Sequence, residues 1–337
     1  MLESLIVTML YPFILNKGGN RVNSLNSSRV SDAEIIDMCH TTKAIDANTV
    51  LIHMYNAWNK GVAHHIYNDT VVKRRMQLFN SELLVAEFVR QRTCIPVPFH
   101  QRYIPPTLND PKSCIVMQFI QGTSVSEVWS TLSWWMKFRI CATVRYYVYQ
   151  LRRLPGHVGI DVPGPLGSEI DRPYCSGRLF SEGGVERSLV ASYRDLCRWY
   201  SERLEWMQLL WHTPLRENSG AQTVDIPPFD RSRPLAIVHQ DLHPKNMILG
   251  SDGQLWIIDW EWAGVYPDWF EYGNAILHAE ASSESDIPFS WRSWIPWMFG
   301  RFEGSGQMPF IRTIMYTLQR LPDDITESVE KLRARKR

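Results

Sequence analysis

The amino-acid sequence predicts an α+β protein whose two unequal parts meet near Gly122. Between residues 50 and 122, strand-like runs surround a single helical pattern, which indicates a small mixed α/β part. After Gly122, long apolar stretches with helical periodicity dominate, and loops rich in Gly, Pro and polar residues separate them. We therefore expect a larger, mainly helical part over residues 123–330.

The composition is that of a globular protein. The chain has 337 residues, of which 45% are hydrophobic and 21% charged, so it can bury a full core and is not a disordered chain. Lys and Arg number 36 and Asp and Glu 35. This balance argues against a broad nucleic-acid surface, which would need clustered positive charge.

The cysteines and the apolar segments indicate a cytoplasmic protein without a membrane anchor. Six cysteines lie far apart with no C-x-x-C pair, which favours reduced, buried thiols over a secreted protein with three disulfides. The apolar N-terminus carries Glu3 where a signal peptide has a basic residue. Three basic residues interrupt the apolar run Trp129–Leu151, so we expect a buried amphipathic helix there.

Local signals predict the elements of the first part. Residues 1–49 form a poorly assigned extension with one predicted helix, Ser31–His40, capped by Ser31 or Asp32. Residues 50–73 are typical of strands. A helix should span Asn80–Arg92 and end before the IPVP segment, because proline cannot continue a helix. The apolar run Cys114–Ile120 predicts a buried strand.

The second part should be mainly helical, with a few strands near its middle. Its predicted elements are two long helices, Ser124–Leu154 and Leu189–Trp211, and two short strands, Leu235–His239 and Leu255–Trp260. A small hairpin should occupy residues 246–254 between the two strands. Helices should fill the remainder up to a basic tail at residues 331–337.

The residues that indicate a chemical function lie in IVHQDLHPKNMILGSDGQLWIIDWEWAG, residues 237–264. Asp241 and Asn246 are five residues apart on a loop after the first strand, and Asp259 ends the next strand. Phosphoryl transfer from ATP needs a carboxylate at the acceptor hydroxyl and oxygen ligands for Mg²⁺. Although an isolated D-x-x-x-x-N is often a turn, three oxygen donors around one point indicate a kinase-type active site.

HQDLHPKN and IIDWEWAG resemble the Brenner-type motif of the aminoglycoside phosphotransferase and choline kinase family, small-molecule relatives of protein kinases. TVVKRR, SELLVAEFVRQRTCIPVP, IVMQFIQGTSVSEVW and YPDWFEYGNA also resemble fungal members of this family. The resemblance covers about residues 50–280. It implies a protein-kinase-like two-lobe fold, with a nucleotide-binding N-lobe at 50–122 and a helical C-lobe with the catalytic loop at 123–330.

The resemblance also implies a role for each matching residue of the motif. Asp241 would accept the proton of the acceptor hydroxyl. Asn246 and Asp259 would hold the magnesium ions that bridge the phosphates of ATP. His239 and His243 would brace the catalytic loop through hydrogen bonds rather than move protons.

Lys73 would bind the α and β phosphates, and Glu82 on the following helix would hold the lysine in place. Arg74 is the alternative to Lys73, but strand alternation places Lys73 on the same face as Val71. Glu87 is the alternative to Glu82, and the early position of the family's glutamate in this helix favours Glu82.

The connection between the lobes should meet the adenine ring, unless it is an ordinary core strand; its residues are Met117, Gln118, Phe119 and Ile120. The phosphate loop, NAWNKGVAHHIY, has Gly61 as its single glycine, and side chains elsewhere keep the backbone from a close approach. Two hypotheses follow. The chain is an ATP- and Mg²⁺-dependent kinase acting on a hydroxyl of a small molecule, or a pseudokinase-like nucleotide- or metabolite-binding module.

The sequence does not specify the acceptor molecule. Asp268, Glu271 and Tyr272 are candidates for its pocket, and the acidic residues would suit a cation such as an amino sugar or choline. They could equally be charges on a helix surface. A protein acceptor is disfavoured because no A-P-E segment follows Asp259. An aromatic cluster forms either a cation–π pocket or a structural core, and its members are Trp291, Trp294 and Trp297.

Overall fold

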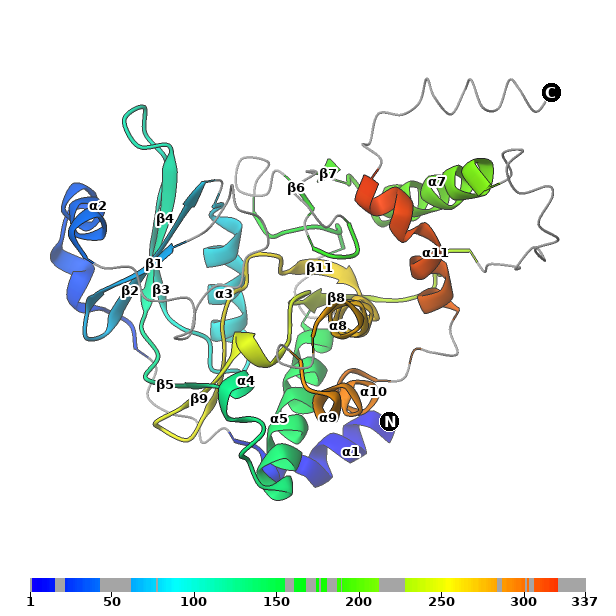
Figure 1. The fold of residues 1–337 in the computed structure, drawn as a ribbon, viewed down its shortest axis with the longest axis horizontal. Helices are drawn as coiled ribbons and strands as arrows, with labels where there is room; N and C mark the ends of the chain where they lie inside the picture. Colours follow the sequence, from blue (N-terminus) through cyan, green and yellow to red (C-terminus); the bar gives the residue numbers. More distant parts are fainter. Residues whose placement is uncertain are drawn as a thin grey trace.

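The computed structural model describes residues 2–15, 22–42, 62–76, 78–154, 161–167, 174–175, 177–180, 187–188, 190–211, 228–283, 287–300, 302 and 306–320. A lobe built on an antiparallel sheet is followed by a mainly helical lobe (Figure 1). The structure thus confirms the predicted α+β class, with a smaller part built on a sheet and a larger, mainly helical part.

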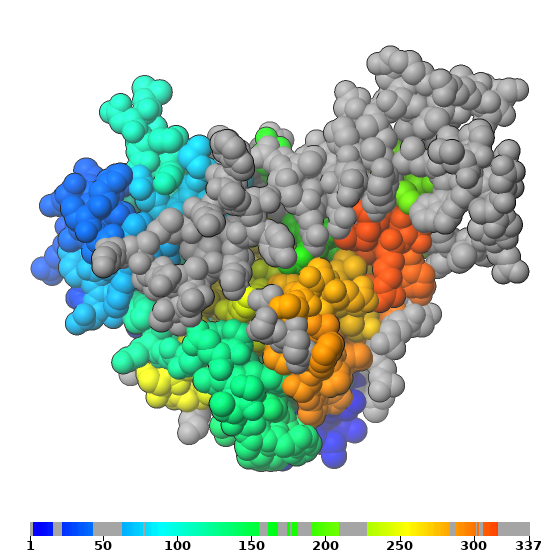
Figure 2. All heavy atoms as spheres, viewed as in Figure 1, coloured from blue at the N-terminus to red at the C-terminus, as the bar shows by residue number. Residues whose placement is uncertain are grey.

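The smaller lobe contains a four-stranded antiparallel sheet in the order β1-β2-β4-β3. Helix α3 (Ser81–Arg92) lies between β2 and β3 in the chain. Its strands are β1 (Val62–Tyr67), β2 (Thr70–Met76), β3 (His100–Ile104) and β4 (Lys112–Gln118). The tip of the β3–β4 hairpin projects from the surface, and Leu108 on it is fully exposed (Figure 2). The helix and the buried strand predicted at Asn80–Arg92 and Cys114–Ile120 are confirmed as α3 and β4.

Helix α2 (Asp32–Thr41) covers one face of this sheet and confirms the helix predicted at Ser31–His40. Its N-cap is Ser31, whose hydroxyl accepts a hydrogen bond from the N–H of Glu34 at 3.3 Å. The Glu34 carboxylate in turn accepts from the N–H of Ser31 at 2.9 Å. This reciprocal capping box satisfies two backbone donors that the first turn leaves without partners.

Alternation along β2 separates the two faces of the sheet. Val72 packs with Val116 and the α2 residues on one face. Val71 packs with Met117 on the other face, which looks toward the helical lobe. Lys73 is two residues from Val71 and therefore shares that inner face.

The larger lobe contains most of the helices and several short strands. Its described helices are α1 (Leu2–Leu10), α4 (Val125–Val128), α5 (Trp134–Arg153), α7 (Tyr193–Trp211), α8 (Phe270–Ala281), α9 (Phe289–Arg292), α10 (Ile295–Phe299) and α11 (Gln307–Arg320). Its described strands are β5 (Gly122–Ser124), β6 (Tyr174–Cys175), β7 (Arg187–Ser188), β8 (Leu235–Val238), β9 (Met247–Gly250), β10 (Leu255–Ile257) and β11 (Gly264–Pro267). Short 3₁₀ turns occupy Tyr11–Phe13, Asn26–Arg29 and Pro244–Asn246. Among the described helices, none combines the length and apolar character that crossing a membrane requires.

The helical stretch predicted over Ser124–Leu154 is present, but two helices share this range instead of one. Helix α4 ends at Val128, and α5 begins only after Ser133, whose hydroxyl accepts a hydrogen bond from the N–H of Met136 at 3.3 Å. A capping serine stops the preceding turn from continuing into the next helix. Apolar residues on both sides of the break conceal it from hydrophobic periodicity.

The two predicted short strands are present as β8 and β10, although they do not pair with each other. Strand β8 pairs with β11, and β10 pairs with β9, which is joined to β5. The predicted hairpin over residues 246–254 is the β9–β10 pair. Asp259 lies just beyond the end of β10.

The N-terminal segment packs on the helical lobe. Leu10 and Ile14 form a buried cluster with Ala142 of α5. The N–H of Leu15 donates to the hydroxyl of Thr143 at 2.9 Å. Helix α1 lies beside α10 (Figure 1), since Ile6 belongs to the same cluster as Trp297. Residues 2–15 are thus spatially separate from α2, which lies on the smaller lobe.

Candidate active site

The candidate site is centred on the loop between β8 and the 3₁₀ turn Pro244–Asn246. Gln240 on this loop has a φ of 69°, and Asp259 has a φ of 64°. Within the described ranges, these two are the only residues other than glycine with a positive φ. Non-glycine residues adopt this region at a cost, and such strain is concentrated at functional sites. Both strained positions lie at motif residues or beside them.

Two histidines shape the loop, and each accepts a hydrogen bond from the backbone N–H two residues further along the chain. Nδ1 of His239 accepts from the N–H of Asp241, and Nδ1 of His243 accepts from the N–H of Lys245, each at 3.3 Å. Nε2 of His239 donates to the carbonyl oxygen of Ile258 at 3.0 Å. Burial lowers the pKa of His239 to about 4, so this imidazole is neutral at neutral pH. His239 thereby links the loop to the segment that carries Asp259.

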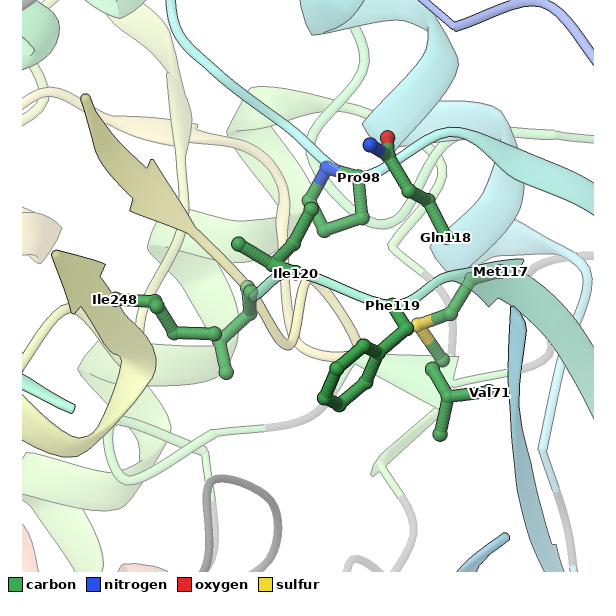
Figure 3. A pocket seen from close by; sticks show the side chains of 8 residues that line it. Val71, Pro98, Met117, Gln118, Phe119, Ile120 and Ile248 are labelled. Atoms are coloured by element: carbon green, nitrogen blue, oxygen red, sulfur yellow. The ribbon is translucent and has the colours of Figure 1, made fainter. Parts of the chain in front are cut away.

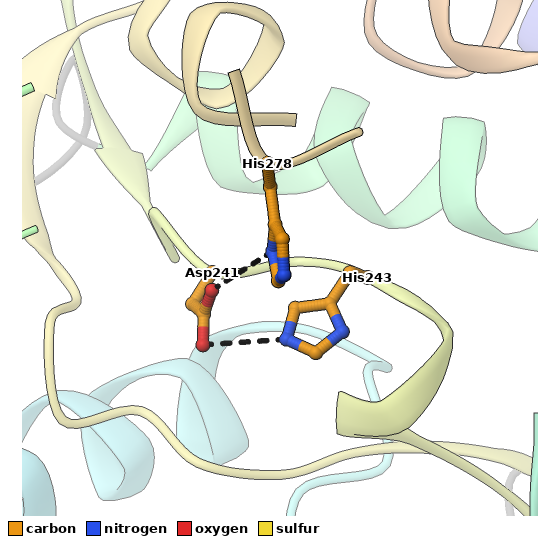
Figure 4. A group of neighbouring side chains, drawn as sticks. All are labelled: Asp241, His243 and His278. Atoms are coloured by element: carbon orange, nitrogen blue, oxygen red, sulfur yellow. Dashed lines mark ion pairs between the residues drawn. The ribbon is translucent and has the colours of Figure 1, made fainter. Parts of the chain in front are cut away.

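Asp241 lies at the centre of the site (Figure 4). Its Oδ2 accepts a hydrogen bond from Nδ2 of Asn246 at 2.9 Å and lies 3.4 Å from Nε2 of His243. Its Oδ1 lies 3.4 Å from Nδ1 of His278 on α8. Burial alone would raise the pKa of the Asp241 carboxyl, but its interactions with His243 and His278 hold that pKa well below its usual value.

Lys73 is buried and contacts three carboxylates, one on α3 and two on the segment after β10. Its ammonium lies 2.9 Å from Glu82, 2.7 Å from Asp259 and 3.1 Å from Glu261. Burial would lower the pKa of Lys73, yet the three carboxylates, Asp259 most strongly, raise it well above its ordinary value. Burial also raises the pKa of Glu82 to about 7, against the opposing effect of Lys73. Arg75 balances part of the excess negative charge by pairing with Glu261.

The alternatives to Lys73 and Glu82 have other partners. Arg74 pairs with Asp110 at 2.6 Å, and Glu87 pairs with Arg90 at 2.7 Å within α3. The predicted ion pair between strand and helix is therefore formed by Lys73 and Glu82.

Asn246 and Asp259 are brought together by the backbone, because the N–H of Ile258 donates to the carbonyl oxygen of Asn246 at 3.1 Å. Carboxylate and amide oxygens are the ligands that Mg²⁺ prefers, so this donor set fits the ion. Two further groups of described residues have ligand atoms within 4.8 Å of one another: Asp241, His243 and His278, and Glu82, Asp259 and Glu261. In the first group, Nδ1 of His243 is an acceptor, so its hydrogen is on Nε2 and points toward Asp241. That arrangement favours a hydrogen-bonded cluster over a metal site.

An apolar pocket, here called the interlobe pocket, lies beside these groups (Figure 3). Its lining residues come from both lobes and are Val71, Pro98, Met117, Gln118, Phe119, Ile120, Ile248 and Ile258. The Gln118 amide points away from the pocket, and its oxygen accepts from the N–H of Phe99 at 3.2 Å. The N–H of Ile120 has no backbone acceptor among the described residues. All four residues predicted to meet the adenine ring line this pocket.

The three residues predicted to bind the substrate have partners within the helical lobe. Asp268 pairs with Arg233, whose Nε lies 2.9 Å from its carboxylate. Glu271 is buried and accepts a hydrogen bond from the N–H of His239 at 2.6 Å. Tyr272 is buried in the main core. Glu271 thus supports the catalytic loop, and the structure does not bring these three side chains together as a pocket.

The tryptophan cluster belongs to the core. Trp291 is 1% exposed and packs edge-on against Trp129 at 5.1 Å between ring centroids. Trp294 and Trp297 pack edge-on against each other at 5.5 Å and are partly buried against the core. Gly61 and the basic tail at residues 331–337 lie outside the described residues.

Two residues of the site, Glu261 and His278, are not among those predicted from the sequence. Glu261 lies two positions after Asp259, and this short spacing is the signal that could have indicated it. His278 lies seven positions after Glu271 on α8, which is close to two helical turns. Residues at this spacing share a helix face, so the position of Glu271 could have pointed to His278.

One comparison with known proteins, a match to a family model, agrees with the motif. Residues 175–295 match the model of the phosphotransferase enzyme family. The matched stretch contains Asp241, Asn246 and Asp259, so it confirms the resemblance to phosphotransferases there. None of the curated proteins compared with the chain matches it.

Solved structures of two aminoglycoside phosphotransferases are similar to the chain. The GDP complex of wild-type aminoglycoside 2'-phosphotransferase-IIIa is 15% identical over 91% of this chain and 94% of that chain, with a TM-score of 0.47. A thermostable mutant of APH(4)-Ia, in a ternary complex with AMP-PNP and hygromycin B, is 12% identical over 90% of this chain and 95% of that chain, with a TM-score of 0.49.

Proposed function

We propose that the protein is a phosphotransferase that moves the γ-phosphoryl group of ATP to a hydroxyl of a small molecule with the help of Mg²⁺. The observation that carries the proposal is the convergence of Asp241, Asn246 and Asp259 with the Lys73–Glu82 ion pair next to the interlobe pocket. Catalysis of phosphoryl transfer depends on positioning and on charge stabilisation. These groups can supply both.

The interlobe pocket supports binding of the adenine base. Its walls are apolar, and they come from the inner face of the sheet at Val71 and from the helical lobe at Ile248 and Ile258. A flat aromatic ring placed there would be enclosed by both lobes. The N–H of Ile120, which lacks a backbone acceptor among the described residues, would donate a hydrogen bond to a ring nitrogen.

Lys73 would bind phosphate oxygens while it keeps its pair with Glu82. Glu82 is 2% exposed, whereas the side chains of Asp259 and Glu261 are 17% and 19% exposed. A phosphate can therefore replace Asp259 and Glu261 as partners of the Lys73 ammonium, but it cannot replace the buried Glu82. Mg²⁺, held by Asn246 and Asp259, would neutralise charge on the phosphate oxygens.

Asp241 would orient the acceptor hydroxyl and accept its proton. Its hydrogen bonds fix the carboxylate, and its low pKa keeps the group ionised at neutral pH. A weak base suffices here, because phosphoryl transfer passes through a loose transition state in which positioning dominates.

The short connection after Asp259 supports a small-molecule acceptor. Strand β11 begins at Gly264, three residues after Glu261. This leaves no room for the long activation segment with which protein kinases contact their substrates.

A nucleotide- or metabolite-binding module without turnover is the second candidate. The observation that favours it is the occupation of the Lys73 ammonium by three carboxylates, with which a phosphate must compete. A thermal-shift measurement with ATP, in the presence and absence of Mg²⁺, separates the candidates when a panel of hydroxyl-bearing metabolites follows it. Mg²⁺-dependent binding with ATP consumption supports the transferase. Binding without consumption on any acceptor or water supports the module. No ATP binding at all contradicts the transferase and leaves the metabolite-binding form of the module.

A further inference from the structure

Helix α8 contacts the catalytic loop at two points on one face. Glu271 in its first turn accepts a hydrogen bond from the N–H of His239 at 2.6 Å. His278 lies seven residues further on, and seven residues are close to two turns of an α-helix. Its Nδ1 lies 3.4 Å from Oδ1 of Asp241. The helix therefore supports the start of the loop and also the proposed base.

The two oxygens of Asp241 have different surroundings. Oδ2 accepts from Asn246 and lies near His243, as described above. Oδ1 is inaccessible to solvent and makes no hydrogen bond of normal geometry with any residue in the described ranges. The side chain as a whole is 18% exposed, so its accessible surface lies on its other atoms. A buried carboxylate oxygen without a donor is unfavourable, and the ring nitrogen that faces it belongs to His278.

The surroundings of His278 determine its protonation state and its tautomer. Its ring lies edge-on to that of His243, with centroids 4.1 Å apart, and the two rings approach the carboxylate from different sides (Figure 4). Burial lowers the pKa of His278 to about 4; the nearby His243 and Arg178 contribute, and Asp241 opposes the shift. The imidazole is therefore neutral at neutral pH and has one N–H. A carboxylate can only accept, so the hydrogen belongs on Nδ1.

We propose that His278 is a positioning residue for phosphoryl transfer: its Nδ1–H holds the inner oxygen of Asp241, so that the outer oxygen faces the acceptor hydroxyl. This inference rests on the proposed function. The two histidines then have opposite tautomers, with the hydrogen on Nε2 of His243 and on Nδ1 of His278. Without His278, the carboxylate would rotate about its Cβ–Cγ bond and lose its alignment with the hydroxyl.

Two substitutions separate the hydrogen bond from the volume of the ring. In His278→Asn the amide nitrogen stands near the place of Nδ1, whereas His278→Leu fills a similar volume without a donor. With Mg-ATP as the probe and water as the acceptor, His278→Leu should lower kcat by about 10- to 100-fold, the loss expected for a misplaced group. The Kd for Mg-ATP should not change, and His278→Asn should recover most of the rate. Glu280→Gln, on the exposed end of the same helix, is the matched control and should leave both quantities unchanged.

The tautomers give a readout that does not depend on turnover. Imidazole ¹⁵N NMR of the full chain at neutral pH should show His278 with its hydrogen on Nδ1 and His243 with its hydrogen on Nε2. Asp241→Asn should shift the His278 signals. An active parent with His278 protonated on Nε2, or with an unchanged rate in His278→Leu, overturns the positioning role and leaves the proposed function in place. A parent that transfers phosphate to neither water nor any metabolite overturns both.

Discussion

A buried ammonium needs compensating charge, and Lys73 has it from three carboxylates. Two of them, Glu82 and Glu261, would remain if Asp259 were lost. The charge of Lys73 therefore does not require Asp259 for its burial. This separates the proposed role of Asp259 toward the metal from its contribution to the fold.

Asp259→Ala should abolish the Mg²⁺-dependent part of ATP binding, because it removes a proposed oxygen ligand. Asp259→Asn is the matched control, since asparagine keeps an oxygen and tolerates the positive φ at this position. Its loss of Mg²⁺-dependent affinity should be smaller. Titration calorimetry with ATP, with and without Mg²⁺, measures both. Parent-like binding of Mg-ATP by Asp259→Ala would show that the metal is held elsewhere.

Asp241→Asn tests the proposed base. Asparagine keeps the shape and an acceptor oxygen, but it cannot take up the hydroxyl proton. Turnover should fall by about 10²- to 10⁴-fold, the usual contribution of a general base, while the Kd for Mg-ATP stays as in the parent. Steady-state kinetics and calorimetry on the same preparation give the answer. If affinity and turnover fell together, Asp241 would be a structural residue or a metal ligand.

The residues close in sequence could be placed near one another from the motif alone. The 3₁₀ turn brings Asn246 within 2.9 Å of Asp241, which is a local consequence of five residues and a proline. His278 could not be placed in the same way. Its contact with Asp241 depends on how α8 packs against the loop, and a single sequence does not encode that packing in any local signal.

At the scale of the elements, the boundary near Gly122 has a steric cause. Gly122 begins β5, which pairs with β9 of the helical lobe. A Cβ at this position would lie 2.5 Å from the carbonyl oxygen of Leu249 and 2.8 Å from Cα of Gly250. Both atoms belong to backbone that a strand ladder holds in place. Glycine is thus required here by the close approach of two strands.

Gly122→Ala should therefore destabilise the protein by about 1–3 kcal/mol, as overpacking does in other well-packed sites. Thr123→Ala, at the exposed neighbouring position of the same strand, should change the free energy of unfolding by less than about 0.5 kcal/mol. Urea unfolding measures both variants. Equal free energies of unfolding for the two variants would mean that β9 can move away from β5 without destabilising the protein.

Elements bounded by strong local signals could be predicted, and those bounded by packing could not. Helix α2 has a capping box, and α3 ends before a Pro-containing segment, so both were expected close to their observed ranges. The break between α4 and α5 is only the short segment of residues 129–133, and apolar periodicity continues on both sides of it. The pairing of β8 with β11 rather than β10 is a long-range choice that strand propensity does not determine.

Across the whole molecule, buried titratable groups oppose each other in their effect on stability. Burial lowers the pKa values of His100, His239 and His278 from 6.5 to about 4. These three histidines contribute to the free energy of unfolding in full above pH 6.5. That contribution is lost as the pH falls toward 4, because the histidines of the unfolded chain take up protons before those of the folded chain. Burial raises the pKa values of Glu82 and Glu271 from 4.5 to about 7. Their contribution is present below pH 4.5 and is lost as the pH rises to 7.

His100→Gln tests the acid side of this balance, since His100 is on β3 and outside the proposed site. Each such histidine steepens the acid loss of stability by up to about 1.4 kcal/mol per pH unit. The free energy of unfolding of the variant should therefore fall less between pH 6.5 and 4 than that of the parent. An exposed histidine, His40, provides the control His40→Gln, which should leave the slope unchanged. A parent-like slope in His100→Gln would mean that His100 takes up its proton without unfolding.

The interlobe pocket gives a test of the two-lobe site as a unit. Val71 lines the pocket, whereas its neighbour Val72 packs beneath α2 on the opposite face, and both are buried. Val71→Phe and Val72→Phe add the same volume and should cost similar stability, about 1–3 kcal/mol each. Only Val71→Phe fills the space proposed for the base.

Mg-ATP at 100 times its Kd should stabilise the parent by about 2.7 kcal/mol, because it binds the folded state alone. The same concentration should stabilise Val72→Phe to the same extent and leave Val71→Phe unchanged. Since the ligand would contact both lobes, the unfolding transition should shift as one step. Differential scanning calorimetry shows the shift and its shape together. Equal stabilisation of the two variants would place the nucleotide outside the pocket, and a shift confined to one of two transitions would mean that only one lobe binds it.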